Sequence, residues 1–452
     1  MQDTEDNINI KHCIIFGFPA FLVTFDLIAV GMLLQNFADY FDQPVDIIQL
    51  VFSIYSFTMA VFFIPVGMLC DRINPKYILF AGILLFGITS LGIAITSSLL
   101  IMVILRAFMG LSVCFKFVSS LSLVHNLYHG RAKVKMLAYW AAIAAFGAVV
   151  SPIITAFIVK YINWQFIFII NIPVSLIIAY LVFIYLNKIE QTNHTKLYLI
   201  TIVRFSLFIL WIGLLILLLI LMARFWHSQF YHILISIFAL LTAIEVIDTI
   251  KNRIRIQQYI PFSLFTGCFL SGYNYTIMST WLISASIWLN IVTKHNLPLI
   301  GLSLMSFTTM CVIAPIIVAT WLKHKNAESI AFVGVCLNLI GYLLFGLFST
   351  LDVPFYTYCI SFSFLGFGCG LIGPFANVLA LRNIPIKQAG KASGILASYR
   401  WLWAALGSAI ASILWVHSNH TLYWIIIIII VYSIITSIIL LTNSILQKKS
   451  NI

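Results

Sequence analysis

Charged side chains are scarce in this sequence. Asp, Glu, Lys and Arg make up 8% of the 452 residues, whereas hydrophobic residues make up 62%. A water-soluble domain of this composition would have to expose a very large apolar surface, so the scarcity of charge excludes that class. The sequence therefore predicts a polytopic membrane protein, with the lipid bilayer as its surroundings.

Acidic residues are the rarer of the two signs, with 13 Asp and Glu against 25 Lys and Arg. The basic residues stand singly or in twos and threes between apolar runs rather than along one face, which argues against a nucleic-acid partner. The chain also begins with an acidic decapeptide instead of a basic segment, and its first apolar run is long and contains Asp26. We therefore expect no cleaved signal peptide.

Motifs for catalysis and metal binding are missing as well. The eight cysteines show no Cys-x-x-Cys spacing, which favours small packing residues over a disulfide framework or a metal site. His125 and His129 have metal-ligand spacing, but no acid follows the first and a basic loop adjoins, so interfacial histidines are favoured over a zinc site. Without a nucleophile elbow, a P-loop or paired catalytic carboxylates, we predict no enzyme, no metal and no cofactor.

Apolar runs long enough to cross a bilayer are abundant. At about 20 residues per crossing, the sequence predicts fourteen helices, at residues 13–37, 48–70, 77–98, 100–124, 135–160, 165–187, 198–222, 229–250, 261–290, 298–321, 328–349, 354–380, 390–416 and 421–446. Both termini then share one side. Eighteen Lys and Arg lie in the loops of that side and three in the opposite loops, so the positive-inside rule predicts cytoplasmic termini. We expect a bacterial cytoplasmic (inner) membrane.

The helices at 198–222 and 229–250 are very apolar and are bracketed by basic loops. Their charged residues Arg204 and Glu245 lie close enough to the cytoplasmic ends to snorkel. We interpret this pair as an insert between two repeats that face each other across a central cavity. The predicted all-α organisation is an N-terminal six-helix half at 1–190, a two-helix insert with its basic loop at 191–256, and a C-terminal six-helix half at 257–452.

A charged, turn-rich stretch joins the second and third predicted helices. Its glycine would let one helix end approach its neighbour, and its aspartate can pair with a nearby cation or a helix N-terminus. The stretch resembles the Gly-x-Leu-x-Asp-Arg-x-Gly-Arg-Lys signature of the major facilitator superfamily at Gly67, Leu69, Asp71, Arg72 and Lys76, with Asn and Pro at the next Gly and Arg positions. The resemblance implies a conformational gate; a generic basic loop is the alternative.

A second stretch narrows the resemblance. The run from Trp164 to Pro173 is similar to the Trp-Arg-Trp-Ile-Phe-x-Ile-Asn-x-Pro opening of the sixth helix in the fourteen-helix drug/proton antiporter family. With the two-helix insert, it is the most specific family signal in the chain. The resemblance implies a secondary transporter whose two halves rock about a midplane cavity.

Two ionisable residues of the N-terminal half fall inside predicted helices. Asp26 lies near mid-bilayer, where a carboxylate is disfavoured relative to the neutral acid, so it suits a proton carrier; a permanently salt-bridged structural acid is the alternative. Arg106 stands in a segment that resembles the superfamily's Arg-x-x-Gln-Gly motif, which implies proton relay or gating. Pairing with Asp26 to fix helix packing is equally open.

The helix at 135–160 contains the run Gly147-Ala-Val-Val-Ser-Pro152. It is similar to the Gly-x-x-x-Gly-Pro antiporter motif, with Ser151 at the second Gly position. Small residues permit close packing and Pro152 leaves a carbonyl free, so we expect a bendable element that gates the conformational change. A kink without significance for coupling is the alternative.

Candidate substrate contacts lie in both halves. Lys116, deep in its helix, and Arg400, near mid-bilayer, can each bind an anionic group, although Lys116 can also snorkel. The unusually polar helix at 261–290 offers rings and hydrogen-bonding groups to a substrate at Tyr273, Asn274, Tyr275 and Trp281. Hydrogen bonds between helices explain the same polarity equally well.

We therefore expect proton-coupled efflux of a small organic molecule, either a drug or an amphiphilic or anionic metabolite such as a siderophore. Three central cations, Arg106, Lys116 and Arg400, face one central acid, which makes an anion as plausible as a cationic drug. A non-transporting sensor or a lipid-handling protein on the same fold is the alternative. The expected partners are the substrate, protons and lipid, and the sequence identifies no accessory export protein.

Overall fold

The computed structural model describes residues 10–70, 72–128, 130–185, 262–321, 326–351, 353–382, 389–417 and 421–450. Within these ranges the chain forms helices joined by turns, with no strand. The predicted helices at 198–222 and 229–250, and with them the insert at 191–256, lie outside the described residues.

The other twelve predicted helices are all present, with ends that differ from the prediction by a few residues. The N-terminal group comprises α1 (Ile10–Met32), α2 (Leu34–Phe41), α3 (Val45–Ile48), α4 (Leu50–Cys70), α5 (Pro75–Ile95), α6 (Leu99–Leu127), α7 (Gly130–Tyr161) and α8 (Gln165–Tyr185). The C-terminal group comprises α11 (Phe262–Val292), α12 (Leu297–Trp321), α13 (Ala327–Thr350), the 3-10 turn η1 (Phe355–Thr357), α14 (Tyr358–Leu381), α15 (Ala389–His417) and α16 (Thr421–Ser450).

Eleven of the described helices are long and apolar enough to cross a membrane. The helix α15, which contains Arg400, is a twelfth of similar length and packs among them. These spans support the predicted integral membrane protein. The first predicted helix, 13–37, is corrected: α1 ends at Met32 and the polar residues that follow form the separate short helix α2.

Local sequence accounts for the sharp start of α5. Pro75 occupies the first turn, where its missing N–H costs no hydrogen bond, and the Asn74 side chain accepts a hydrogen bond from the Lys76 backbone N–H at 3.1 Å. The loop between α4 and α5 is therefore very short, as the sequence predicts.

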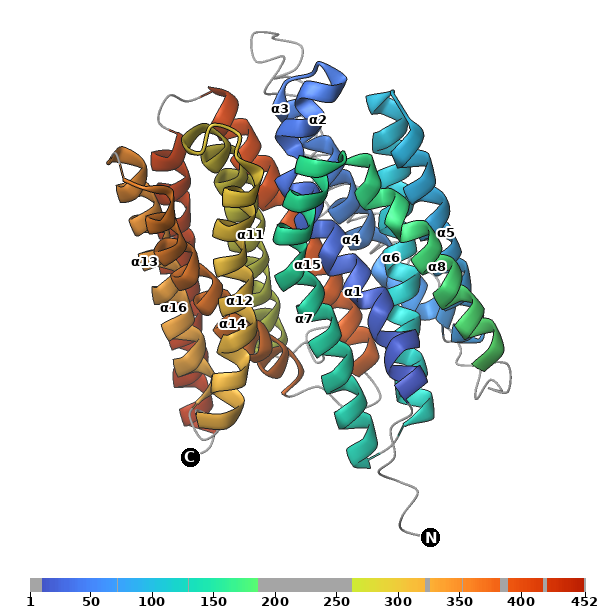
Figure 1. The fold of residues 1–452 in the computed structure, drawn as a ribbon. Coiled ribbons are helices and arrows are strands. Elements are labelled where there is room, and N and C mark those ends of the chain that lie inside the picture. Colours follow the sequence, from blue (N-terminus) through green and yellow to red (C-terminus); the bar gives the residue numbers. More distant parts are fainter. Residues whose placement is uncertain are drawn as a thin grey trace, which may run out of the picture.

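The helices form two groups that meet along a seam. Figure 1 shows α13, α14 and α16 on one side and α5, α6 and α8 on the other, with α1, α7 and α15 between them. Across the seam, α15 packs against α4, α12 against α7, and α1 against α11. The start of α1 and the end of α16 lie at the same end of the bundle (Figure 1), in agreement with an even number of crossings between them.

Candidate functional site

Asp26 and Arg106, the two predicted proton-coupling residues, form an ion pair inside the N-terminal group. Arg106 Nη1 of α6 donates a hydrogen bond to Asp26 Oδ2 of α1 at 2.7 Å, and the side chains are 0% and 1% exposed. Arg106 Nε donates to the Val51 carbonyl at 3.2 Å, and the guanidinium carbon lies 4.1 Å from the centre of the Tyr55 ring. Helices α1, α4 and α6 therefore fix the arginine on three sides.

Several polar atoms around this pair have no hydrogen-bond partner among the described residues. They are Asp26 Oδ1, Arg106 Nη2, Tyr55 Oη and Lys116 Nζ, all buried. Buried polar groups are normally paired, and leaving them unpaired costs free energy. The cluster thus has hydrogen-bonding capacity in reserve, although in this conformation Asp26 has almost no water-accessible surface. Proton exchange at Asp26 requires the surrounding helices to move.

Lys116 lies away from the other predicted substrate residues. It is 1% exposed, and its Nζ lies 3.1 Å from the centre of the Phe86 ring of α5. It interacts electrostatically with Asp26, whereas every predicted substrate residue other than Lys116 belongs to the C-terminal group. The structure therefore places Lys116 with the ion pair.

Helix α7 supports the turn of α1 that carries Asp26. Thr24 Oγ1 donates to the Ala144 carbonyl at 2.6 Å, and Ser151 Oγ donates to the carbonyl of Phe25, the neighbour of Asp26, at 2.7 Å. A Cβ on Gly147 would lie 2.6 Å from the Phe21 carbonyl oxygen, so the α1–α7 contact requires glycine at this position.

The same helix meets the C-terminal group on its other side. A Cβ on Gly301 of α12 would lie 2.6 Å from the Pro152 carbonyl oxygen, so the two backbones approach closely across the seam. Gly147 and Pro152, the predicted gating residues of α7, thus stand where α1, α7 and α12 meet. Helix α7 thus contacts both the turn of α1 that carries Asp26 and helix α12 across the seam.

The predicted clasp between α4 and α5 is only partly described. Asp71 lies outside the described residues, Arg72 is exposed, and Lys76 Nζ lies 4.8 Å from the centre of the Tyr77 ring. The expectation that Gly67 permits a close helix approach is wrong for this conformation. A Cβ there would meet only Val118 Cγ1, at an ordinary 3.9 Å.

Arg400 of α15 lies in the C-terminal group among neutral partners. Its Nε donates to Ser271 Oγ of α11 at 3.4 Å, and its Nη2 donates to Asn377 Oδ1 of α14. Its guanidinium carbon lies 5.7 Å from the centre of the Tyr275 ring, and Arg400, Asn377 and Tyr275 are all partly exposed. Two predicted substrate residues, Tyr275 and Arg400, therefore share one partly open site.

The other predicted substrate residues of α11 divide between this site and the core. Tyr273 is fully buried and its hydroxyl is 2.9 Å from Ser433 Oγ of α16, while Trp281 stacks on Phe307 of α12 at 3.7 Å between ring centres. Both bind neighbouring helices, in accord with the alternative left open above. Asn274, 7% exposed, has an unpartnered Oδ1 and lies next to Gly373 of α14.

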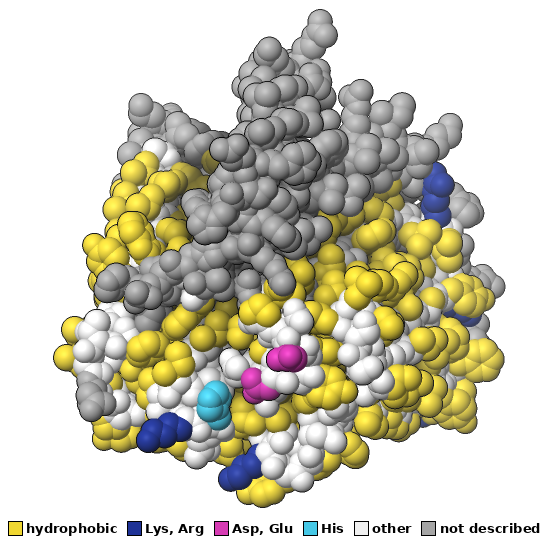
Figure 2. All heavy atoms as spheres, turned by 90° about the horizontal axis from the view of Figure 1, so that it is seen from above, with side chains coloured by type: hydrophobic (Ala, Val, Ile, Leu, Met, Phe, Trp, Pro, Cys, Tyr) yellow, Lys and Arg dark blue, Asp and Glu magenta, His cyan; other side chains and the backbone are white. Residues whose placement is uncertain are grey.

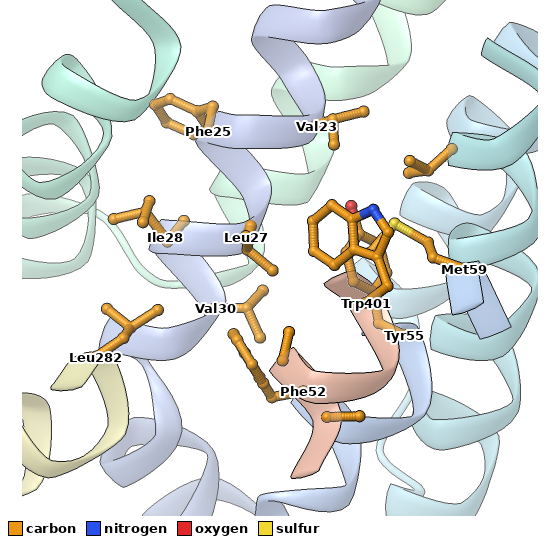
Figure 3. Close-up of a cluster of buried hydrophobic side chains, with 14 of the residues drawn as sticks. Val23, Phe25, Leu27, Ile28, Val30, Phe52, Tyr55, Met59, Leu282 and Trp401 are labelled. Carbon is orange, nitrogen blue, oxygen red and sulfur yellow. The ribbon is translucent and has the colours of Figure 1, made fainter. Parts of the chain in front are cut away.

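Sequence reasoning missed three residues of these sites, Tyr55, Asn377 and Trp401. Tyr55 stands in a cluster of polar residues within an apolar crossing, and Asn377 follows Gly373-Pro374 by one turn, so local polarity was a signal for both. Trp401 had none. Its ring contacts Tyr275 edge-on at 5.5 Å, and Figure 3 shows it reaching from α15 into the buried cluster that contains Tyr55 and Met59.

The face opposite the helix ends at Ile10 and Ser450 carries a polar pocket. Figure 2 shows that face, with two acidic side chains beside a histidine. A cavity of about 250 Å³ crosses the seam there and is lined by Gln35, Asn36, Asp39, Asn290, His295 and Leu297. None of the predicted site residues lines it.

Comparisons with known proteins agree with this architecture. A family model described as Major Facilitator Superfamily matches residues 16–408. The quinolone resistance protein NorB of Staphylococcus aureus (strain bovine RF122 / ET3-1) is 24% identical over 421 residues, which cover 90% of this chain and 89% of NorB. The multidrug resistance protein Stp of Mycobacterium tuberculosis (strain CDC 1551 / Oshkosh) is 22% identical over 405 residues, which cover 87% of this chain and 73% of Stp.

A solved structure shows a similar fold. The crystal structure of a POT family transporter in complex with a thioalcohol-conjugated peptide superposes with a TM-score of 0.72 at 15% identity, over 97% of this chain and 96% of that one. At this identity the likeness extends to the fold alone.

Proposed function

Because the chain belongs to the Major Facilitator Superfamily and is a secondary transporter, we propose that it couples proton entry to export of a small organic molecule by alternating access. The observation that carries the proposal is the buried Asp26–Arg106 ion pair beside the seam. A buried carboxylate next to a moving interface can bind a proton on one side of the membrane and release it on the other.

Proton binding changes the forces within the N-terminal group. A neutral Asp26 loses its charge attraction to Arg106, which weakens the link between α1 and α6. Helix α7 contacts the same turn of α1 through Ser151 and contacts α12 through the Pro152 carbonyl. We propose that this contact passes the change at Asp26 to the other half, so that protonation and rocking occur together.

The energetics allow such coupling. One proton crossing 100 mV releases about 2.3 kcal/mol, and holding a hundredfold gradient of a neutral solute costs about 2.8 kcal/mol. A modest pH gradient or a second proton supplies the difference.

The substrate class follows from the remaining charges. Asp26 compensates Arg106, which leaves Lys116 and Arg400 as buried or partly buried cations without an acidic hydrogen-bond partner among the described residues. An anionic or zwitterionic substrate fits this surplus. The relatives named for quinolone and multidrug resistance support export of drug-like molecules, and their bacterial sources support the bacterial cytoplasmic membrane. The excess of Lys and Arg in the loops on the side of the termini supports cytoplasmic termini.

The test is flux through purified protein in proteoliposomes with an imposed pH gradient, using a quinolone as the first probe. Wild-type protein should move the probe against its gradient, and Asp26→Asn should abolish this while leaving probe binding in place. Asp39→Asn is the matched control, because Asp39 is exposed and, among the described residues, accepts a hydrogen bond from the neutral Gln35 side chain at 3.0 Å. Undiminished proton-driven flux in Asp26→Asn would refute the proposal.

A further inference from the structure

Arg400 forms no ion pair with a described residue, whereas two other described arginines do. Arg106 pairs with Asp26 and Arg382 pairs with Glu328, at 2.7 and 2.8 Å. Arg400 instead donates to the neutral oxygens of Ser271 and Asn377, and no acidic residue in the described part of the chain bonds to it. Its charge is held in place, and no described acidic residue compensates it.

An uncompensated arginine inside a membrane bundle is costly to keep, and such residues usually face a cavity or a charged partner. Arg400 is partly exposed, and its Nη1 donates no hydrogen bond to any described residue. With Nε and Nη2 already anchored, the guanidinium is oriented before a ligand arrives. A planar oxyanion is the chemistry that matches the guanidinium fork.

A polar strip extends from Arg400 along α14 to α11. Asn377 accepts from Arg400 and its Nδ2 donates to the Gly373 carbonyl one turn earlier, at 3.4 Å. A Cβ on Gly373 would lie 3.7 Å from Asn274 Nδ2, in ordinary van der Waals contact, so Asn274 stands directly beside this glycine. The buried Asn274 Oδ1 accepts no hydrogen bond from any residue that the structure describes. The strip thus offers both a cation and an unused amide.

Aromatic rings border the same site. The Tyr275 ring lies 5.7 Å from the Arg400 guanidinium carbon and meets the Trp401 ring edge-on at 5.5 Å. Tyr275 is partly exposed, so a flat ligand has a ring to pack against next to the cation.

We propose that the C-terminal half binds the carboxylate of an aromatic anion, with Arg400 as the carboxylate ligand, Tyr275 as the ring contact, and Asn377 and Asn274 as the polar wall. This deepens the proposed export function, since it names the substrate class at one site, and it rests on that function only for the direction of transport. Binding itself needs no proton gradient.

The experiment measures binding to the purified full chain in detergent by calorimetry, without a gradient. The probes are 1-hydroxy-2-naphthoate, its uncharged carboxamide and cyclohexanecarboxylate. Wild-type protein should bind the aromatic carboxylate at least about 10-fold more tightly than either comparison compound, because one lacks the charge and the other lacks the flat ring.

Variants assign the binding to this site. Arg400→Gln should weaken naphthoate binding by about 30-fold or more, and Arg400→Lys by about 10-fold, because an ammonium cannot offer the planar fork. Tyr275→Leu should weaken it by about 3- to 10-fold. Arg382→Gln is the matched control and should leave binding unchanged, since Arg382 belongs to a separate ion pair with Glu328. Thermal unfolding of each variant confirms that it is folded.

Equal affinity of wild-type protein for the naphthoate and its carboxamide overturns the proposal, as does unchanged binding in folded Arg400→Gln. Proton-driven flux of the quinolone without naphthoate binding removes this inference and leaves export standing. Naphthoate binding that depends on Arg400, without proton-driven flux of any probe, supports the site and removes the proposed coupling.

Discussion

Arg106 and Arg400 are both arginines within the helix bundle, one in each group of helices, yet their surroundings are opposite. Arg106 is fully buried, paired with an acid at 2.7 Å and stacked on Tyr55. Arg400 is partly exposed, and its hydrogen bonds to described residues go to neutral oxygens. In the first arrangement the arginine is matched by an acid and water has almost no access, which suits a proton that enters only when helices move. The second leaves a cation available, which suits an anionic ligand.

The largest expected difference between the two sites is in stability. Arg106→Met leaves the Asp26 carboxylate without its counter-ion in an apolar site, and removing one partner of a buried pair typically costs about 3–5 kcal/mol. Arg400→Met should cost about 1 kcal/mol, because only hydrogen bonds to neutral groups are lost. Denaturant unfolding in detergent checks both values. A similar cost for the two variants would remove the distinction between a paired and an open site.

The next effect concerns the α1–α7 contact, which we expect to keep water away from Asp26. Gly147→Ala would bring a Cβ to 2.6 Å from the Phe21 carbonyl, so α7 must move off α1, at an overpacking cost of about 1–3 kcal/mol. We expect proton leak in the absence of substrate, measured with a pH dye inside proteoliposomes.

The matched control is Gly67→Ala, because a Cβ there meets only Val118 at 3.9 Å. Alanine is the better helix former, so this change should be neutral or slightly stabilising and should cause no leak. Leak from both variants would show that the α1–α7 contact is not what seals the acid.

A smaller effect is expected at Trp401, which contacts Tyr275 beside Arg400 and lies in the same buried cluster as Tyr55 beside Arg106. Coupling between the two sites predicts that naphthoate affinity differs between the pH at which Asp26 is protonated and the pH at which it is ionised. If the Trp401 ring carries this coupling, Trp401→Leu should reduce that difference about 5-fold and retain binding. Calorimetry at two pH values measures this linkage. An undiminished pH dependence would show that the two sites communicate by another route.

The smallest effect separates two tyrosines of one helix. Tyr273 hydrogen-bonds Ser433 in the core, so Tyr273→Phe should cost about 0.5–1.5 kcal/mol of stability and leave naphthoate affinity within about twofold. Tyr275→Leu should leave stability nearly unchanged and weaken naphthoate binding by about 3- to 10-fold. A loss of naphthoate binding in Tyr273→Phe would show that Tyr273 does contribute to the substrate site.

The outcome for individual residues shows where sequence reasoning succeeds. The positions of the helices could be predicted from the apolar runs. Asp26, Arg106 and Arg400 could be singled out because a charged side chain inside the bilayer costs free energy whichever way the side chain points. Tyr273 and Tyr275 could not be separated, because α11 is polar on several faces and its rotation is set by packing against α14, α15 and α16. The sequence predicts Lys116 as a substrate residue because the position of a residue along its helix does not show which other helix its side chain contacts.

The most direct test of the account is an infrared titration of purified protein that follows carboxylic acid bands with pH. We predict a band from protonated Asp26 that appears as pH falls, is absent in Asp26→Asn and persists in Arg400→Gln. A pH-dependent spectrum that is the same in wild-type protein and Asp26→Asn would contradict the claim that Asp26 carries the transported proton.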